Sequence, residues 1–507
     1  MDSNDLPAGA ARTHPALTTR KQLSLLPDVD RIPLRTSLLP EPARRIYCNR
    51  GLRMDQIDWV GFDMDYTLAQ YRQDQMDRLT IQAALDKLIA QGFPESLRGL
   101  DPTPRFPIRG LVIDAKLGNV LKMDRHKYVK RAYHGLRELS YDERRTHYRA
   151  TRVQPRDRKR YHFIDTLYAL SEVTLFAAGV EHMEREGMAV DYARWFHAIR
   201  ECVDRSHQDG SILDEITQHP ASYLVLDPEL PLTLHKLRSA GKRLFLLTNS
   251  QPDYTDRIMA HVFERLPAQY RSWKQLFDVV IAAAQKPGFF HGEEPVKDRR
   301  GRPVERLRRG TIYVGGSALA LERLTSIGGD RVLYVGDHIY GDVLRAKKHS
   351  PWRTAMIIPE LDDELFGVTK TAPEAARWDQ LEEARGALLD ELRALRQALR
   401  HGRLAPLSPP ISEAEAHARA LRFTRRMERT KAQLRAIESE SAELEQSIES
   451  EFHPFWGPLL KAGAEPSSFG HQVKTYACLY TMRVSNFLGY SSLHYFRPPR
   501  ERLPHEG

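Results

Sequence analysis

Four short polar motifs combine residue types that could carry out a reaction together. Each motif directly follows a short apolar run. In chain order they supply an acid pair, a hydroxyl and amide group, a lysine and a second acid pair: Asp63 and Asp65 in DMDYT; Thr248, Asn249 and Ser250 in TNS; Lys286 in QKPGFF; and Asp337 and Asp342 in GDHIYGD. One such motif alone is more often turn or capping chemistry. Their joint occurrence, each time after an apolar run, predicts a catalytic site.

The acid pairs and the lysine suit the transfer of a phosphoryl group. A carboxylate such as Asp63 can attack phosphorus to give an acyl phosphate that water later splits. Asp65 can protonate the leaving oxygen and afterwards activate the water. Attack on a phosphate dianion needs positive charge, which implies Mg²⁺ held by oxygen ligands, with Asp337 as a ligand and Asp342 as its support. Lys286 and the donors of the TNS motif are predicted to bind the phosphate oxygens.

The spacing of the first acid pair also predicts where its strand ends. On a regular strand, residues i and i+2 point to the same face, so Asp63 and Asp65 would repel each other there. We therefore expect the strand to end at Asp63 and a loop to carry Asp65 into a cleft, where a cation neutralises the negative charge.

The elements that must position these residues alternate between apolar strands and helices. Stretches with helical periodicity, such as residues 228–241, lie between apolar runs. This alternation predicts a doubly wound, mostly parallel sheet with helices on both faces. Ligands of such sheets bind beyond the carboxyl ends of the strands, where all four motifs stand. The runs are IDWVGFD (57–63), KRLFLLTN (242–249), FDVVIAAA (277–284) and RVLYVGD (331–337).

The predicted fold is α/β, with a Rossmann-like core, a large inserted cap domain and a helical C-terminal region. The gap of roughly 150 residues between the first two apolar runs is too long for a loop and predicts the insertion. A second C-terminal helix, at about 411–450, carries apolar residues too sparsely for a long coiled coil, so both helices are expected to pack on the core or on a neighbouring subunit. The predicted parts are a flexible N-terminal arm (1–40), the first part of the core (41–75), the cap (76–220), the second part of the core (221–370) and the C-terminal region (371–507).

The composition is that of an ordinary soluble globular protein. The three cysteines lie far apart in the sequence, and no stretch approaches the roughly 20 apolar residues that a membrane span needs. A cytoplasmic location without membrane contact is therefore expected. The formal net charge of +9 is concentrated in residues 122–160, which hold fourteen Lys and Arg against five Asp and Glu. This excess can steer anionic substrates, and nucleic-acid binding is disfavoured because no nucleic-acid-binding motif accompanies the charge.

The four motifs resemble those of the haloacid-dehalogenase (HAD) phosphohydrolase superfamily, and longer stretches resemble the cytosolic purine 5′-nucleotidase family within it. Among these are LLTNSQPDYTDRIMAHVFE, YVGDHIYGDVLRAKK and the closing YFRPPRERLPHE, so the resemblance spans residues 40 to 505 or so. It implies that Asp63 is the nucleophile and Asp65 the acid/base. The implied Mg²⁺ ligands are Asp63, the Asp65 carbonyl and Asp337, and the implied phosphate ligands are Thr248, Asn249, Ser250 and Lys286.

The resemblance also implies a nucleoside-binding site in the cap. The segment IRECVDRSHQDGSIL (199–213) resembles the family's base-recognition segment, with Arg200, Asp204 and His207 at the base-binding positions. On a helix these three residues share one face. A carboxylate there can accept a hydrogen bond from N1–H of hypoxanthine or guanine, which adenine lacks.

Several positions depart from the family pattern. Tyr168 and Ala169 stand where the family has Phe-Asn, which keeps an aromatic surface for the base and removes an amide, and Leu213 stands where the family has a lysine. A trace of the family's regulatory nucleotide site implies a nucleotide effector, although Asp165 replaces an amide there and would repel a polyphosphate. The residues of this effector site are Arg156, Asp157, Phe163, Tyr340 and Lys348.

These observations predict a Mg²⁺-dependent 5′-nucleotidase for purine nucleoside monophosphates, with IMP and GMP preferred, that can also pass the phosphate to a second nucleoside. A homo-oligomer, dimer or tetramer, is expected. Three alternatives stay open. The substrate could be another small phosphate monoester, because the cap decides it, or the chain could be a noncatalytic binding or scaffold protein. Nucleic-acid binding through residues 122–160 would predict an affinity that falls steeply with salt.

Overall fold

The computed structural model describes residues 40–100, 105–149, 153–154, 157–326, 328–344, 351–404, 412–500 and 504–506. The predicted N-terminal arm lies outside these residues except for Pro40. Residues 42–507 form one unit of the chain.

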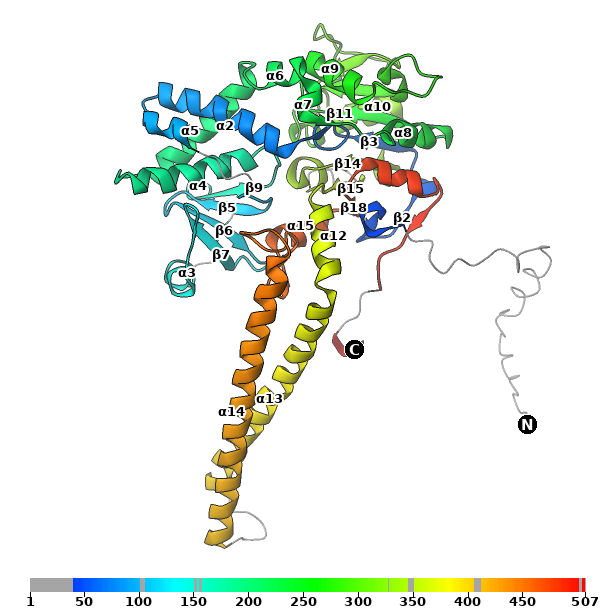
Figure 1. Ribbon diagram of the computed structural model, residues 1–507. Coiled ribbons are helices and arrows are strands. Elements are labelled where there is room, and N and C mark those ends of the chain that lie inside the picture. The colour runs from blue at the N-terminus through cyan, green and yellow to red at the C-terminus, as the bar shows by residue number, and fades with distance from the viewer. Residues whose placement is uncertain are drawn as a thin grey trace, which may run out of the picture. The chain divides into compact units, whose positions relative to one another are not determined.

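An eight-stranded sheet lies at the centre of this unit (Figure 1). Its strand pairs are parallel except for the edge strand β1, which is antiparallel to its neighbour. The chain order reverses at β3, because β11, β12 and β13 follow on one side and β14, β15 and β18 on the other. Doubly wound sheets bind their ligands at such a switch point. In spatial order the strands are β1 (Tyr47–Cys48), β18 (Leu479–Thr481), β15 (Arg353–Ile357), β14 (Val332–Gly336), β3 (Trp59–Phe62), β11 (Arg243–Leu247), β12 (Val279–Ala282) and β13 (Ile312–Val314).

Alternate residues of the central strands enter two apolar clusters, because successive side chains point to opposite faces of the sheet. From β3, Val60 and Phe62 join one cluster and Trp59 joins the other. Burial on both faces makes these strands continuous apolar runs, and this is why they could be recognised in the sequence. The predicted α/β fold is confirmed. Helices α8 (Leu230–Ser239), α9 (Pro252–Val262) and α12 (Leu361–Lys370) contribute to the first cluster and α10 (Ala318–Thr325) to the second.

The insertion between β3 and β11 forms the cap, which has a five-stranded antiparallel sheet of its own. The chain leaves the core through β4 (Gln70–Tyr71) and returns through β10 (Leu224–Val225), and these two short strands pair with each other. The cap sheet has the order β8 (Arg137–Glu138), β7 (Val129–His134), β6 (Asn119–Met123), β5 (Leu111–Asp114) and β9 (Tyr161–Ile164). The cap helices are α2 (Gln73–Ala90), α3 (Tyr141–Tyr148), α4 (Leu170–Arg185), α5 (Tyr192–Gln208), α6 (Leu213–Gln218) and α7 (Pro220–Tyr223).

The two long C-terminal helices, α13 (Ala372–Leu404) and α14 (Glu413–Ser450), pack along each other as a hairpin (Figure 1). Leu381 and Leu392 of α13 and Leu434 of α14 are buried in the seam between them. α14 also buries Thr430, four residues before Leu434, and Ser441, seven residues after it. The prediction that α14 is too poor in apolar residues to pair in this way is therefore wrong, since small polar side chains fill some of the seam positions.

The remaining short elements lie close to the core. Strand β2 (Leu52–Arg53) pairs with β19 (Tyr495–Phe496), and β16 (Lys461–Ala462) pairs with β17 (Glu465–Pro466). Helix α15 (Ser468–Tyr476) follows β17. Among the helices that the structure describes, none has both the length and the apolar character needed to cross a membrane.

Candidate active site

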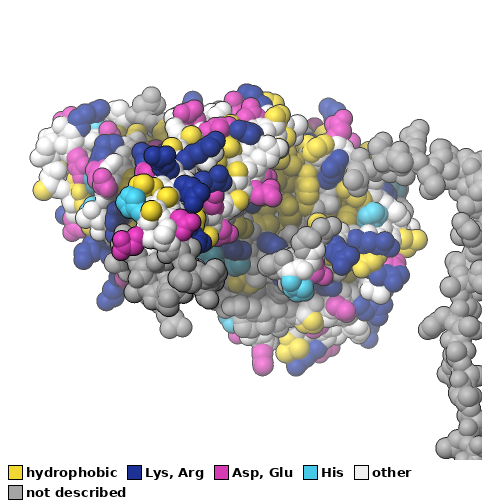
Figure 2. Space-filling model, turned by 90° about the horizontal axis from the view of Figure 1, so that it is seen from below, with side chains coloured by type: hydrophobic (Ala, Val, Ile, Leu, Met, Phe, Trp, Pro, Cys, Tyr) yellow, Lys and Arg dark blue, Asp and Glu magenta, His cyan; other side chains and the backbone are white. Residues whose placement is uncertain are grey.

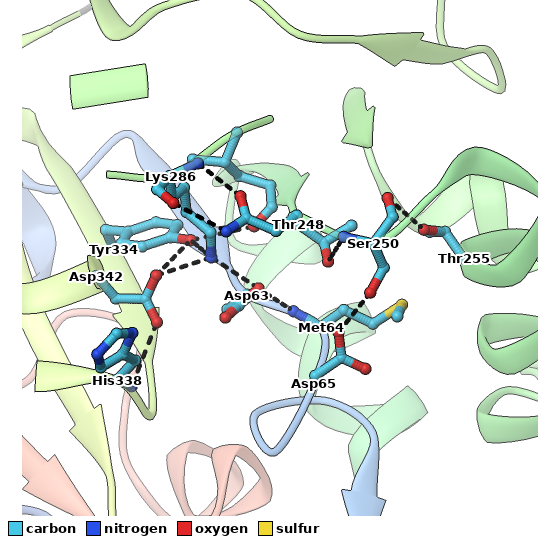
Figure 3. Close-up of polar contacts among 12 residues, drawn as sticks. Asp63, Met64, Asp65, Thr248, Ser250, Thr255, Lys286, Tyr334, His338 and Asp342 are labelled. Carbon is cyan, nitrogen blue, oxygen red and sulfur yellow. Dashed lines mark hydrogen bonds and ion pairs between the residues drawn. The ribbon is translucent and has the colours of Figure 1, made fainter. Parts of the chain in front are cut away.

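The carboxyl ends of β3, β11, β12 and β14 bring the four polar motifs together (Figure 3). β3 ends one residue before Asp63, whose N–H still donates to the Val335 carbonyl at 2.9 Å. A turn in which three amides donate to the Met64 carbonyl then carries Asp65 away from the strand direction. Within this turn Tyr66 has a φ of 54°. Such backbone strain in a non-glycine residue is typical of functional loops. The predicted loop after the strand is confirmed, and the strand ends at Phe62, one residue before the predicted position.

Lys286 is a buried ammonium group that joins two carboxylates. Its Nζ lies 2.8 Å from Asp63 Oδ1 and 2.7 Å from Asp342 Oδ1, and only 4% of its side chain is exposed. The Tyr334 hydroxyl accepts a further hydrogen bond from Nζ at 3.0 Å. Burial alone would lower the pKa of Lys286, but the Asp342 and Asp63 carboxylates hold it well above its usual value. Lys286 is therefore a fixed positive charge beside Asp63 (Figure 3).

Asp342 holds Lys286 from the side opposite Asp63. Its second oxygen, Oδ2, accepts the N–H of His338 at 3.3 Å. This close packing requires a glycine at position 336, because a Cβ there would lie 2.5 Å from Asp342 Oδ2. The residue that Asp342 supports directly in this structure is Lys286.

Asp65 is surrounded by hydroxyl groups rather than by cations. Tyr71 donates to Asp65 Oδ1 at 2.6 Å and Ser250 to Oδ2 at 2.7 Å, and Tyr168 of the cap lies close enough to help lower the pKa of this carboxylate. The Tyr254 hydroxyl in turn contacts that of Tyr71 at 2.9 Å. Burial raises the pKa of Asp65, against the hydrogen bonds from Tyr71 and Ser250 that favour its charged form. A carboxyl group with a raised pKa is suited to donate a proton near neutral pH.

The TNS motif forms the loop after β11, and its side chains contact other candidate catalytic residues. The Asn249 amide accepts the N–H of Lys286 at 2.6 Å and donates to the Lys286 carbonyl at 2.9 Å. Ser250 donates its hydroxyl to Asp65, and its N–H bonds to the buried Thr248 hydroxyl at 3.1 Å. The predicted phosphate-binding role of this motif stays a prediction. In this structure Asn249 positions the Lys286 loop, and Ser250 orients the acid/base candidate.

Three buried carboxylates form a group that can hold a metal ion. Oxygen atoms of Asp63, Asp337 and Asp342 all lie within 4.8 Å of one another. Burial, together with the nearby Asp342 carboxylate, raises the pKa of Asp337 to about 8, although the charges of Arg109 and Lys286 oppose this shift. The pKa of Asp63 is likewise raised well above its usual value by burial, despite the opposing charge of Lys286. One lysine is thus insufficient to balance this negative charge. An oxygen-rich, negatively charged and buried donor set suits Mg²⁺.

This charge imbalance predicts a pH-dependent response of the protein to Mg²⁺. The folded protein keeps a proton on Asp337 that the unfolded chain releases near pH 4, so without metal its stability falls as pH rises from about 4 to about 8. Mg²⁺ requires ionised carboxylates and offsets their repulsion. We expect millimolar Mg²⁺ to raise the melting temperature more at about pH 8 than at about pH 5.5, measured by scanning calorimetry. Asp337→Asn should reduce this difference, and an equal Mg²⁺ effect at both pH values would contradict the assignment.

The predicted cap residues lie on α5 and at the start of α4, and they fall into two groups. His207 packs edge-on against Tyr168, with ring centroids 5.7 Å apart, and through Tyr168 it is linked to Asp65. Arg200 instead contacts Glu172 of α4, with Nε 3.2 Å from Oε2. Asp204 is exposed on the same helix and, within the described part of the chain, has no hydrogen-bond or ion-pair partner. The expected helix carrying Arg200, Asp204 and His207 is confirmed.

The predicted effector site can be followed only in part. Arg156 and Lys348 lie outside the described residues, and of Tyr340 only the backbone is described. Asp157 is exposed, and Phe163 lies on β9 of the cap sheet. Burial raises the pKa of Asp165, the departure from the family pattern, to about 6, while the charges of Lys127 and Arg109 oppose this. Binding of a nucleotide effector stays a prediction.

Several basic side chains between residues 122 and 160 form hydrogen bonds or ion pairs with other parts of the protein. The buried Lys122 donates to the carbonyls of Trp456 and Pro458, both at 2.6 Å. Arg131 pairs with Glu449 of α14 at 2.5 Å, and Arg160 forms two hydrogen bonds with the buried Asp114. On the face shown in Figure 2, Lys and Arg side chains lie next to Asp and Glu side chains. These contacts give Lys122, Arg131 and Arg160 a structural role, and nucleic-acid binding by the rest of the segment stays untested.

Sequence reasoning missed residues that support the site from a distance. Tyr71 and Tyr254 give no signal in the sequence, because aromatic residues near a strand end are ordinary core residues. Glu172, whose pKa burial raises to about 7, lies within the apolar stretch of α4. Arg109, which is buried beside Asp337, stands in a stretch that reads only as the start of a cap strand.

Comparisons with known proteins agree with the geometry of the site. A sequence profile of the 5′ nucleotidase family matches residues 46–507. The rat protein "5′-nucleotidase domain-containing protein 2" is 30% identical over 497 residues, covering 94% of this chain and 82% of the relative. The human protein of the same name is 29% identical, covering 94% of this chain and 88% of the relative.

Solved structures with a similar arrangement include CbbY from Rhodobacter sphaeroides in complex with phosphate and an archaeal β-phosphoglucomutase from a Pyrococcus strain. CbbY has 15% identity and a TM-score of 0.23, covering 59% of this chain and 86% of its own. The mutase has 11% identity and a TM-score of 0.27, with the same coverage of 59% and 86%. The family profile and the curated relatives, together with the four motifs at the strand ends, show that the chain belongs to the 5′ nucleotidase family.

Proposed function

We propose that this protein is a Mg²⁺-dependent 5′-nucleotidase that releases phosphate from purine nucleoside monophosphates through an aspartyl-phosphate intermediate. Nucleotidase or phosphatase activity follows from the family; the metal, the base preference and the intermediate are the proposed parts. The observation that carries the proposal is the separation of two carboxylates at one strand end. Asp63 lies beside Lys286 and two further acids, whereas Asp65 lies among hydroxyl groups.

The two carboxylate oxygens of Asp63 make different contacts, which suggests different roles for them. Oδ1 accepts the N–H of Met64 at 2.7 Å and contacts Lys286 at 2.8 Å. These two donors occupy Oδ1, so we assign the attack on phosphorus to Oδ2. The new bond joins Oδ2 to phosphorus while the bond from phosphorus to the 5′-oxygen breaks. Bound at Asp63, Asp337 and the Asp65 carbonyl, Mg²⁺ would supply positive charge to the phosphate oxygens.

Asp65 moves the protons in both half-reactions. In the first, its carboxyl group gives a proton to the leaving 5′-oxygen, and in the second the resulting carboxylate takes a proton from the attacking water. Water then displaces phosphate and regenerates Asp63. Tyr71 and Ser250 hold one oxygen each of Asp65, so the carboxyl group keeps one orientation through the cycle. A nucleoside in place of water would receive the phosphate by the same step.

The preference for IMP and GMP rests on Asp204. Its carboxylate is exposed and unpaired within the described residues, while the neighbouring Arg200 is held by Glu172. It can accept a hydrogen bond from N1–H of hypoxanthine or guanine. Such a hydrogen bond would favour hypoxanthine and guanine over adenine, because adenine has no proton on N1 to donate. A homo-oligomeric state and a cytoplasmic location also stay predictions.

The test is phosphate release by the purified full-length protein with Mg²⁺, across nucleoside monophosphates and sugar phosphates, with and without ATP. We expect IMP and GMP to be hydrolysed faster than AMP and the pyrimidine nucleotides. Asp204→Ala should lower kcat/KM for IMP about tenfold or more and leave that for AMP nearly unchanged. Faster phosphate release from another small phosphate ester would support the reaction mechanism and reject the nucleoside-binding role of the cap residues. The departures from the family pattern at Ala169 and Leu213 would help to explain that result. No release from any substrate would favour a noncatalytic binding protein.

A further inference from the structure

Arg109 is a buried arginine of the cap whose guanidinium group reaches the core beside the predicted metal ligand. Its side chain is 0% exposed. Nε and Nη2 donate to the two carboxylate oxygens of Glu360 at 2.7 and 2.6 Å. Nη1 donates to the backbone carbonyl of Asp337 at 2.7 Å. One cap side chain therefore contacts the loop after β14 and the loop after β15 at the same time.

Packing around Arg109 leaves its side chain little freedom. The guanidinium carbon lies 5.0 Å from the centre of the Phe469 ring, at the start of α15. The next residue, Gly110, has a φ of 84°, and a Cβ at this position would lie 2.5 Å from the Cβ of Phe469. The backbone of the cap and α15 are thus in direct contact at this point. Arg109 cannot turn away from Asp337 unless the cap moves relative to α15.

The hydrogen bond to Asp337 matters because of where this residue lies. Asp337 is only 5% exposed, and its carboxylate belongs to the acidic group that can hold a metal ion. A hydrogen bond from a charged donor to its carbonyl fixes the orientation of the peptide, and hence the direction of the side chain. Residues that orient metal ligands in this way commonly contribute about 10-fold to 100-fold in metal affinity.

We propose that Arg109 is a positioning residue that couples the attachment of the cap to the affinity of the metal site. The proposal rests on the proposed function only in taking Asp337 as a metal ligand. Because coupling between two sites is reciprocal, a cap movement that withdraws Arg109 weakens metal binding, and a bound metal stabilises the attached cap. Substrate binding in the cap and metal binding in the core then influence each other through one side chain.

The test measures Mg²⁺ binding to the metal-free full-length protein by titration calorimetry, without substrate. Arg109→Lys keeps the charge but cannot span Glu360 and the Asp337 carbonyl with one planar fork. We expect its Kd for Mg²⁺ to rise about tenfold. The matched control is Arg160→Lys, since Arg160 forms the same type of paired contact with the buried Asp114, at 2.9 and 2.7 Å, within the cap. The control should lose thermal stability to a similar extent and bind Mg²⁺ as the unaltered protein does.

The possible results separate the two proposals. Unchanged Mg²⁺ affinity in Arg109→Lys, with both variants equally destabilised, would show that Arg109 only ties the cap to the core and would overturn the inference.

If Arg109→Lys fails to fold, the titration is repeated with Glu360→Gln, which weakens the contact between Glu360 and Arg109 without altering Asp337. Weaker Mg²⁺ binding by Glu360→Gln supports the coupling, and unchanged binding overturns it. If the unaltered protein binds Mg²⁺ but hydrolyses no substrate, the proposed function falls while the role of Arg109 is still decided by the titrations. If it binds no Mg²⁺, both proposals fall.

Discussion

Asp63→Asn is expected to lower kcat for IMP hydrolysis by about 10⁴-fold or more, because the variant lacks the attacking oxygen. An amide of the same shape can still occupy the space beside Met64 and Lys286. The amide cannot form the acyl phosphate, so the variant cannot hydrolyse IMP through an aspartyl-phosphate even at a reduced rate. The measurement is phosphate release at saturating IMP and Mg²⁺, with enough enzyme to detect rates of this size.

A folding control for Asp63→Asn follows from the electrostatics of the site. Burial and neighbouring acids raise the pKa of Asp63, so the ionised group is unfavourable in the metal-free protein. Removing this charge should leave the melting temperature without metal equal or higher at neutral pH. The variant should also still bind IMP, which calorimetry can measure. Activity within about tenfold of the unaltered protein would exclude Asp63 as the nucleophile.

The core and the positions of its catalytic residues could be predicted because the relevant signals are local. β3, β11, β12 and β14 are short apolar runs buried on both faces, and each ends where a polar motif begins. In a parallel sheet the carboxyl ends of the strands meet at one edge. Recognising the runs was therefore enough to bring Asp63, Lys286 and Asp337 together.

The contacts of Asn249 and Arg109 could not be predicted, because they depend on distant parts of the chain. The Asn249 side chain forms two hydrogen bonds with the backbone of Lys286, 37 residues later in the chain. The letters TNS alone do not tell whether the asparagine binds a backbone segment or a phosphate. Arg109 contacts residues more than 200 positions away. Its burial depends on a partner carboxylate, Glu360, which the sequence gives no reason to connect with it.

The pairing of α13 with α14 could not be predicted from the sequence for a different reason. Counting only apolar residues on α14 leaves gaps, since Thr430 and Ser441 occupy buried seam positions. The Thr430 hydroxyl donates to the Arg426 carbonyl of its own helix at 2.9 Å, so its burial leaves no unpaired donor. Small polar residues can therefore occupy buried positions of a helix seam that a count of apolar residues alone would miss.

Asp65→Asn is expected to lower kcat for IMP by about 10²-fold to 10⁴-fold, the usual contribution of a general acid/base. Tyr71 and Ser250 each contact one oxygen of Asp65, and asparagine keeps an oxygen for only one of them. A matched control is Tyr254→Phe, which removes a hydroxyl that contacts Tyr71 but is not hydrogen-bonded to Asp65 itself. This control should change kcat by less than about tenfold.

The two roles of Asp65 can be separated by the choice of leaving group. A nucleoside 5′-oxygen needs a proton to leave, whereas p-nitrophenolate leaves without one. With p-nitrophenyl phosphate, Asp65→Asn should therefore form the aspartyl-phosphate at a rate close to normal and hydrolyse it slowly, because the water has lost its base. Rapid mixing should show a burst of p-nitrophenol equal to the enzyme concentration, and mass spectrometry after acid quenching should locate the phosphate on Asp63. Equal losses with both substrates and no burst would mean that Asp65 orders the site without transferring protons.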